Sequence, residues 1–323
     1  MKKLLICLIA FSTLTACKQK PIAAPSVPIA ISTPTFSADS AYIFTKEQCD
    51  FGPRTPNSSA HDQCALYLAN KLKKYGATVI EQNAKLKGHD GTELRSVNII
   101  ASYNPASTTR ILLFSHWDSR PWADNDPNTN NHSKPVMGAN DGASSVGVLL
   151  EMARQFNTQK PNVGVDIIFF DMEDYGSSAS NSNTNTEDTW CLGTQYWANH
   201  PHIKGYHAKY GILLDMIGGA NATFPREQIS DTYASDVVTK VWTQAQSLGF
   251  QQYFKDEKGG AITDDHVYVN KIAGIPSIDI IHYSQTGFAS YWHTVNDTMD
   301  KVDKNTLHAV GSTLLHVVYN EKP

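Results

Sequence analysis

Apolar runs of four to seven residues alternate along this chain with segments whose apolar residues lie three or four positions apart. The runs predict buried strands, because they are rich in β-branched and aromatic residues and end at polar positions. The spaced segments predict helices, and two of these end at a glycine, the usual C-terminal cap. The predicted strands are 78–82, 96–103, 110–115, 165–171, 210–216 and 277–282, and the predicted helices are 64–75, 142–156, 194–199, 233–248 and 304–319.

This alternation of strands and helices predicts an α/β fold with three αβα layers around a central mixed, mostly parallel sheet. In an open sheet of this class, residues at the carboxyl ends of the strands converge on one crevice. Acidic residues and histidines that follow the predicted strands are therefore expected to meet in space, even where they are far apart in the sequence.

Length and composition place limits on function. The chain has 323 residues, 41% of them apolar, which is enough for one large domain with a full core. The formal net charge is −4 and no clustered basic patch is present, so a nucleic-acid partner is not expected. Cys49 and Cys64 could form a disulfide, and Cys191 could equally be a buried thiol.

The first residues predict export from the cytoplasm. Two lysines precede the apolar stretch 4–11, which is too short to span a bilayer and is typical of a signal peptide. The sequence Leu-Thr-Ala-Cys at 14–17 resembles a bacterial lipobox, which implies cleavage before Cys17 and a lipid anchor on it; the alternative is a plain secretory signal with a chance cysteine. We predict a signal peptide at 1–16, a lipidated Cys17 with a proline-rich flexible tether at 17–37, and a globular domain at 38–323. The protein is expected in the bacterial cell envelope, anchored to a membrane, with this domain in the periplasm.

Three acidic residues are strong candidates for metal and proton chemistry. Asp141 precedes a predicted helix and could be its N-cap, but the turn formed by 138–140 would instead aim its carboxylate into the crevice. Glu173 and Asp174 follow an apolar strand, where two adjacent carboxylates favour a bound cation or a shared proton over two free charges. One of them would bind metal while the other carries protons, and a solvated strand end is the alternative.

Other polar residues gain weight from these three. Asp215 interrupts an apolar run, where a charge needs a partner. His293 and Asp264 would each be interpreted as structural if they stood alone, and Asp264 could simply precede a helix cap. His116 directly follows the strand predicted at 110–115. Zinc binds imidazole nitrogen and carboxylate oxygen, so the set fits a zinc site.

A series of short motifs gives a more specific signal. In chain order they resemble the zinc-dependent glutaminyl cyclases, relatives of the zinc aminopeptidases, and the resemblance extends from residue 51 to the C-terminal region. The motifs are FGPRTPNS at 51–58, SHWDS at 115–119, GAND at 138–141, IFFDMED at 168–174, LLDMIG at 213–218, ITDDH at 262–266 and WHT at 292–294.

The resemblance implies a zinc-exopeptidase-like fold and one zinc ion per chain. The implied zinc ligands are Asp141, Asp174 and His293. Animal cyclases have glutamate where this chain has Asp174, and they have an inter-loop cysteine pair that is missing here. The aspartate is similar to bacterial cyclases of the animal-type class, so the chain resembles that bacterial subtype.

The resemblance also implies the reaction and the residues that carry it out. Glu173 would be the general acid/base, with Asp215 and Asp264 in a hydrogen-bonded acidic network beside it. The implied activity is that of an acyltransferase, which converts the N-terminal glutamine of peptides and exported proteins to pyroglutamate and releases ammonia. The implied substrate pocket is lined by Trp190, Ile262, Phe288 and Trp292.

Two alternatives remain at this point. A two-zinc aminopeptidase would use a five-ligand set consisting of His116, Asp141, Asp174, Asp215 and His293, so His116 is either a second-metal ligand or structural. The motifs around Asp264 and Trp292 favour the cyclase, since neither residue has a role in the peptidase. A tethered binding protein on the same scaffold predicts decayed ligands, and no ligand is lost in this sequence.

Overall fold

The computed structural model describes residues 32–178, 187–284 and 286–323. The predicted signal peptide, Cys17 and most of the predicted tether lie outside these residues. Ser32–Pro323 form one compact unit. Within the part of the chain that the structure describes, no helix is both long and apolar enough to cross a bilayer.

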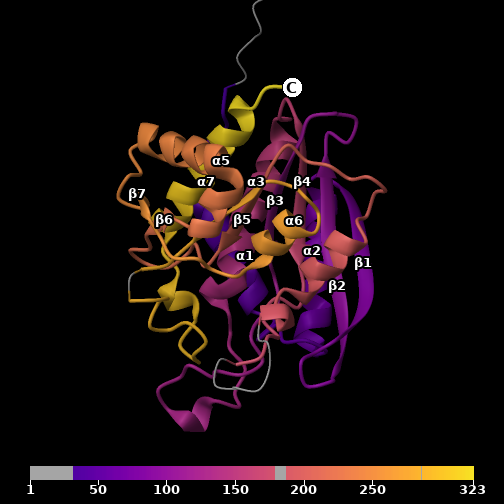
Figure 1. Cartoon of the computed structure of the whole chain (residues 1–323), viewed down its shortest axis with the longest axis vertical. Helices are drawn as coiled ribbons and strands as arrows, with labels where there is room; N and C mark the ends of the chain where they lie inside the picture. Colours follow the sequence, from indigo (N-terminus) through magenta and orange to yellow (C-terminus); the bar gives the residue numbers. More distant parts are fainter. Residues whose placement is uncertain (1–31, 179–186, 285) are drawn as a thin grey trace, which may run out of the picture. The chain divides into compact units, whose positions relative to one another are not determined.

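A six-stranded sheet forms the centre of this unit, in the order β1-β2-β4-β3-β5-β8 (Figure 1). Strands β3, β4, β5 and β8 run parallel to one another, whereas β1 and β2 add antiparallel pairs at one side. The expected mixed, mostly parallel sheet is therefore confirmed. The strands are β1 (Thr78–Lys87), β2 (Glu93–Tyr103), β3 (Arg110–His116), β4 (Gly164–Phe170), β5 (Gly211–Asp215) and β8 (Ser277–Ile281), and β6 (Phe224–Arg226) and β7 (Phe254–Lys258) form a separate pair.

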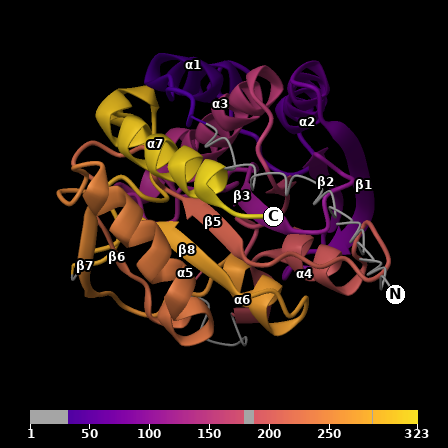
Figure 2. The same ribbon diagram turned by 90° about the horizontal axis from the view of Figure 1, so that it is seen from above.

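Helices cover both faces of the sheet and complete the three predicted layers, as the view in Figure 2 shows. One face carries α1 (Ala38–Cys49), α2 (Ser59–Lys74), α3 (Ser145–Thr158) and α7 (Lys304–Asn320). The other face carries α4 (Leu192–Asn199) and α6 (Asp265–Lys271), and α5 (Gln228–Ser247) packs along β8. Strand β4 is buried at every position, which explains why its sequence is apolar apart from Asp166, whose carboxylate is paired with Arg110 at 2.6 Å.

The structure extends several predicted elements and adds two helices. Helix α2 begins at Ser59 rather than at residue 64, because Ser58 caps it by accepting a hydrogen bond from the amide of His61 at 3.1 Å. Helices α1 and α6 were not predicted. Phe36, within the predicted tether, is 4% exposed and packs against Gly311 of α7, so the packed structure begins before residue 38.

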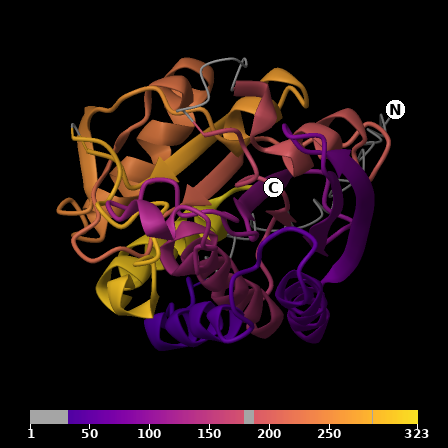
Figure 3. The ribbon, with the colours of Figure 1, turned by 90° about the horizontal axis from the view of Figure 1, so that it is seen from below.

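The carboxyl ends of β3, β4 and β5 lie at one edge of the sheet, because these strands are parallel neighbours. The segment that follows β3, magenta in Figures 1 and 3, projects from this edge. Left-handed backbone at non-glycine residues recurs here, with φ near 59° at Met172, 51° at Met216 and 53° at His293. Such conformations are costly and gather where function requires them.

Candidate zinc and substrate site

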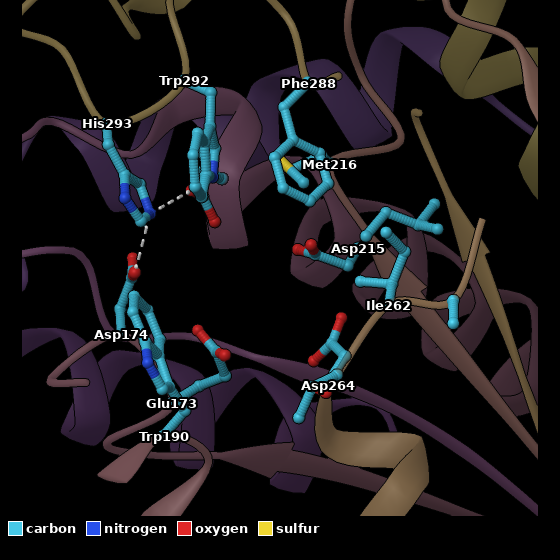
Figure 4. Close-up of a pocket in the computed structure, with 14 residues that line it drawn as sticks. Glu173, Asp174, Trp190, Asp215, Met216, Ile262, Asp264, Phe288, Trp292 and His293 are labelled. Carbon is cyan, nitrogen blue, oxygen red and sulfur yellow. Dashed lines mark ion pairs between the residues drawn. The ribbon is translucent and has the colours of Figure 1, made fainter. Parts of the chain in front are cut away.

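The acidic residues predicted to converge do meet at this edge. His116 ends β3, Glu173 and Asp174 follow β4, and Asp215 ends β5. Glu173, Asp174 and Asp215 line one cavity of about 310 Å³, within the size range of small-molecule pockets (Figure 4). The predicted pocket residues Trp190, Ile262, Phe288 and Trp292 also line it, together with Asp141, Asp264 and His293.

The three predicted zinc ligands form one compact donor set. The Nε2 atom of His293 lies 3.1 Å from Oδ1 of Asp174 and 3.5 Å from Oδ2 of Asp141. Two atoms bound tetrahedrally to zinc at its usual bond lengths are roughly 3.3 Å apart, so both spacings suit a shared ion. Oδ1 of Asp174 is buried and accepts no hydrogen bond within the protein. The donor set therefore fits zinc.

His116 lies at the centre of a second cluster that shares Asp141. Its Nε2 atom is 3.0 Å from Oδ1 of Asp141 and 3.2 Å from Oδ1 of Asp215. Its Nδ1 atom is 3.5 Å from the buried carboxylate of Asp118. Burial lowers the pKa of His116, but hydrogen bonds to these three aspartates outweigh it and raise the pKa well above its usual value. His116 thus occupies the position that a second-metal ligand would take, and its imidazole bridges two acids directly.

Burial and neighbouring charges act strongly on the carboxyl group of Glu173. Burial raises the pKa of Glu173, and the charges of Asp174 and Asp264 raise it further, so that it lies well above the usual value although His116 opposes this. The thiol of Cys191 lies 3.4 Å from Oε1 of Glu173 and donates a hydrogen bond to it. A carboxyl group with a raised pKa is suited to proton transfer, and the division of labour expected between Glu173 and Asp174 stays a prediction.

Asp264 combines the two roles that the sequence left open. It caps α6 by accepting a hydrogen bond from the amide of Asp265 at 2.5 Å, and it also lines the cavity. Burial and the charge of Asp215 raise the pKa of Asp264 well above its usual value. The acidic network expected beside Glu173 is therefore a set of carboxyl groups that restrain one another's ionisation.

Aromatic rings form the walls of the cavity around His293. The ring of Trp292 stacks on His293 with centroids 3.8 Å apart, and Phe288 lies 4.4 Å from Trp292. From the other side, Trp190 lies parallel to His293 at 6.0 Å and is itself covered by Arg120. In Figure 4 these rings and Ile262 enclose the space in front of the carboxylates.

Two buried aspartates hold the backbone of the candidate ligand segments. Asp118 accepts hydrogen bonds from the amides of Glu173 and Asp174, each at 3.1 Å. Asp297 accepts them from the amides of Asn140 and Asp141 at 2.9 and 3.0 Å. Neither aspartate was predicted, although Asp118 lies two residues beyond His116 and so was within reach of the strand-end argument.

Asp124 and the cysteines also have defined environments. Asp124 is bound by Arg120 at 2.6 Å and lies 3.6 Å from Nδ1 of His293, where it can orient the imidazole. Cys49, Cys64 and Cys191 are all free and buried, so the disulfide considered between the first two is not formed.

The fold and this site define a class of proteins. The family model for "Peptidase family M28" matches residues 98–318, about two thirds of the chain, and the chain belongs to this family. The predicted resemblance to glutaminyl cyclases and zinc exopeptidases is confirmed by relatives within it.

Three relatives illustrate the similarity. Bacteroides thetaiotaomicron glutaminyl cyclase, in a crystal structure with N-acetylhistamine, is 53% identical, with a TM-score of 0.89 over 90% of this chain and 100% of the other. A Zn-dependent exopeptidase from Parabacteroides distasonis is also 53% identical, with a TM-score of 0.88 over the same shares. The glutaminyl-peptide cyclotransferase of Gloydius blomhoffii is 25% identical over 81% of this chain and 75% of its own length.

Proposed function

We propose that this chain is a glutaminyl-peptide cyclotransferase that converts N-terminal glutamine to pyroglutamate and releases ammonia. The observation that carries the proposal is the arrangement of Glu173 beside the donor set of Asp141, Asp174 and His293, within a cavity walled by aromatic rings. Glutaminyl cyclases at 53% and 51% identity, each covering 90% of this chain, support it.

Asp141, Asp174 and His293 would hold one zinc ion. A zinc ion bound there supplies a Lewis acid that polarises the γ-carbonyl group of the substrate glutamine. Asp124, close to Nδ1 of His293, would fix the orientation of that imidazole. His116 remains in contact with Asp141 and Asp215 and would act as a structural bridge.

Glu173 would move the proton. Its carboxylate accepts a proton from the α-amine, whose nitrogen forms a bond to the γ-carbon, and the bond from that carbon to the amide nitrogen breaks. Glu173 returns the proton to the departing nitrogen, which leaves as ammonia, so no water is consumed. The raised pKa of Glu173, caused first by burial, favours its return to the neutral form.

The aromatic walls would bind and orient the substrate. Phe288 and Trp292 pack against each other on one side of the cavity, and Trp190 closes the other. A cavity of about 310 Å³ is at the lower end of the range for ligand sites and suits one amino acid residue with the following chain outside. The same walls exclude bulk water, which would otherwise compete with the α-amine and hydrolyse the substrate amide.

The decisive assay compares two products. Ammonia released from an N-terminal glutaminyl peptide should depend on zinc, while a leucyl peptide should release no free amino acid. Free amino acid without ammonia would instead support the two-zinc aminopeptidase, with His116 and Asp215 as ligands of a second ion. Elemental analysis of the same sample gives the number of zinc ions.

Glu173→Gln tests the role of the general acid/base. The variant should fold and keep zinc but lose nearly all turnover, because an amide cannot accept and return the proton. Glu93→Gln is a suitable control. Glu93, on β2, is exposed, pairs with Lys85 on β1 and lies outside the cavity. Undiminished turnover in Glu173→Gln would contradict the assigned role.

We also propose that Cys17 is lipidated and anchors the protein to an envelope membrane. The lipobox-like sequence at 14–17 supports this. Cys17→Ala should abolish incorporation of labelled fatty acid and release the protein from membranes; unchanged labelling would overturn the anchor.

A further inference from the structure

The FGPRTPNS motif at 51–58 has no role in the site described above, yet its arginine is fully buried beneath it. The guanidinium of Arg54 donates three hydrogen bonds, to the carbonyls of Trp117, Met137 and Gly138 at 3.0, 2.8 and 2.7 Å. The last two carbonyls belong to the segment that leads into Asp141. A buried cation is costly, and carbonyl oxygens alone compensate for it only in part.

A buried carboxyl group, that of Asp297, binds the same segment through its amides. The carboxylate of Asp297 accepts from Asn140 at 2.9 Å and from Asp141 at 3.0 Å, and its backbone carbonyl accepts from Ala139 at 3.3 Å. Asp297 is fully buried and lies four residues beyond His293. The segment 137–141 is thus held by a guanidinium group at its carbonyls and by a carboxyl group at its amides.

The segment between these two groups has an unfavourable backbone. Gly138 is left-handed at φ 63°, Asp141 has non-helical angles, and Gly142 has φ 80°, three residues before α3 begins. A β carbon on Gly138 would come within 3.0 Å of the Arg54 guanidinium and within 2.5 Å of the Asp141 carbonyl. Arg54 can approach this closely only because Gly138 has no β carbon. In turn, the hydrogen bonds from Arg54 and to Asp297 hold the segment in its unfavourable conformation.

We infer that Arg54 and Asp297 form a clamp, one on the carbonyl groups and one on the amides of segment 137–141, that sets the zinc affinity by fixing Asp141 in its ligand position. Both are positioning residues, since each acts through backbone groups of the segment. Asp297 also joins the segment that carries Asp141 to the loop that carries His293, so two ligands from distant parts of the chain keep one spacing. The inference rests on the proposed zinc ligands.

The test measures zinc affinity in the full chain by competition with a chromophoric chelator. Asp297→Asn keeps the shape but offers one acceptor oxygen, so one of the two amides faces an NH₂ group. Arg54→Lys keeps the charge but replaces three fixed donors by a single ammonium group. In each variant the zinc dissociation constant should rise about 10- to 100-fold, the usual effect of losing an outer-shell partner. Saturating zinc should restore most of the turnover.

Arg110 and Asp166 supply a matched control. Arg110 is bonded to Asp166 at 2.6 and 2.7 Å and donates to the carbonyls of Tyr103 and Asn104, at the opposite ends of the strands. Arg110→Lys and Asp166→Asn should lower the thermal unfolding midpoint without changing the zinc dissociation constant. Comparison with these variants separates a specific effect on zinc from a general loss of stability.

The outcomes distinguish this inference from the proposed function. A zinc dissociation constant within about threefold of wild type in Asp297→Asn would overturn the clamp, even if Arg54→Lys fails to fold. An equal rise in the control variants would also overturn it. A wild-type chain that binds no zinc would instead overturn the ligand assignment itself.

Discussion

Glu227 connects the stability of the fold to the shape of the substrate pocket. It precedes α5, is 1% exposed, and caps the helix by accepting hydrogen bonds from the amides of Ile229 and Ser230 at 2.8 and 2.6 Å. The same carboxylate accepts from the amide of Ile262 at 3.0 Å and lies 3.2 Å from Nε2 of His266. Ile262 lines the cavity, so we predict that Glu227→Gln weakens both the fold and substrate binding.

The magnitude can be obtained in two ways. The glutamine keeps one oxygen as acceptor for the amides of Ile229 and Ile262 but presents an NH₂ group to Ser230 and His266. The buried amide of Ser230 then has no acceptor, which costs about 1–3 kcal/mol of unfolding free energy. The charge-assisted character of the remaining hydrogen bonds is lost as well. Burial raises the pKa of Glu227, but bonds from His266, Ile229 and Ser230 outweigh it and lower the pKa from 4.5 to about 2. That shift corresponds to about 3 kcal/mol of stability.

The sign of the pH dependence follows from this lowered pKa. The stabilisation by Glu227 is complete above pH 4.5, the pKa of the unfolded chain, and is lost as the pH falls toward the folded pKa of about 2. Glutamine has no such dependence. The difference in unfolding free energy between wild type and Glu227→Gln should therefore be about 3 kcal/mol at pH 7 and about 2 kcal/mol at pH 3.5.

Urea unfolding at pH 7 and pH 3.5 measures the stability, and KM for a glutaminyl peptide measures the pocket. Glu321→Gln is the control, because Glu321 also has a pKa of about 2, owing to Lys209, Lys240 and Tyr210, but lies outside the cavity. The control should lose stability in the same pH window with KM unchanged. A Glu227→Gln protein with wild-type KM, or with a stability deficit that does not shrink in acid, would refute the reasoning.

Three further changes test the site. Gly176→Ala places a β carbon within 1.9 Å of the Trp190 ring, so KM should rise several-fold with the circular dichroism spectrum unchanged; an unchanged KM would mean that this wall is not used. Trp292→Leu removes the ring stacked on His293 and should raise KM about tenfold, which peptide kinetics would show. Zinc removal by a chelator should abolish turnover and lower the thermal unfolding midpoint, because zinc bound to the folded state stabilises it, and turnover that survives chelation would contradict the metal assignment.

The sequence predicted the sheet better than its periphery. Strands β3 and β4 are buried along almost their whole length, so their apolar runs gave clear signals. Strand β1 continues five residues beyond its predicted end at position 82. The prediction stopped too early because β1 is an edge strand with exposed lysines and glutamate, which weaken its apolar signal. Helix α1 was missed because its buried residues include Thr45 and Gln48, which leave no periodic apolar stripe.

The site was predictable where parallel strand ends determine it. His116, Glu173, Asp174 and Asp215 follow from the rule that carboxyl ends converge, which needs only the strand assignments. His293 lies in a loop beyond β8, and family resemblance alone placed it in the site. Asp297, like Arg54, acts through backbone groups, which leave no pattern in a single sequence.

Several carboxyl groups crowd around this cavity, and their mutual repulsion destabilises it. The groups that hold each acid in place indicate how the residues differ in role. Asp118 and Asp297 hold the backbone of all three acids, Glu173 included. The carboxylates of Asp141 and Asp174 are in addition paired with His116 and His293, at 3.0 and 3.1 Å. The side chain of Glu173 has a weaker restraint, the Cys191 thiol at 3.4 Å. A divalent cation would compensate the fixed carboxylates, while the less restrained carboxyl group could turn between two nitrogens of one substrate. Rigid ligands and a mobile proton carrier are what cyclisation requires, because the attacking and leaving nitrogens occupy different positions around the same carbon.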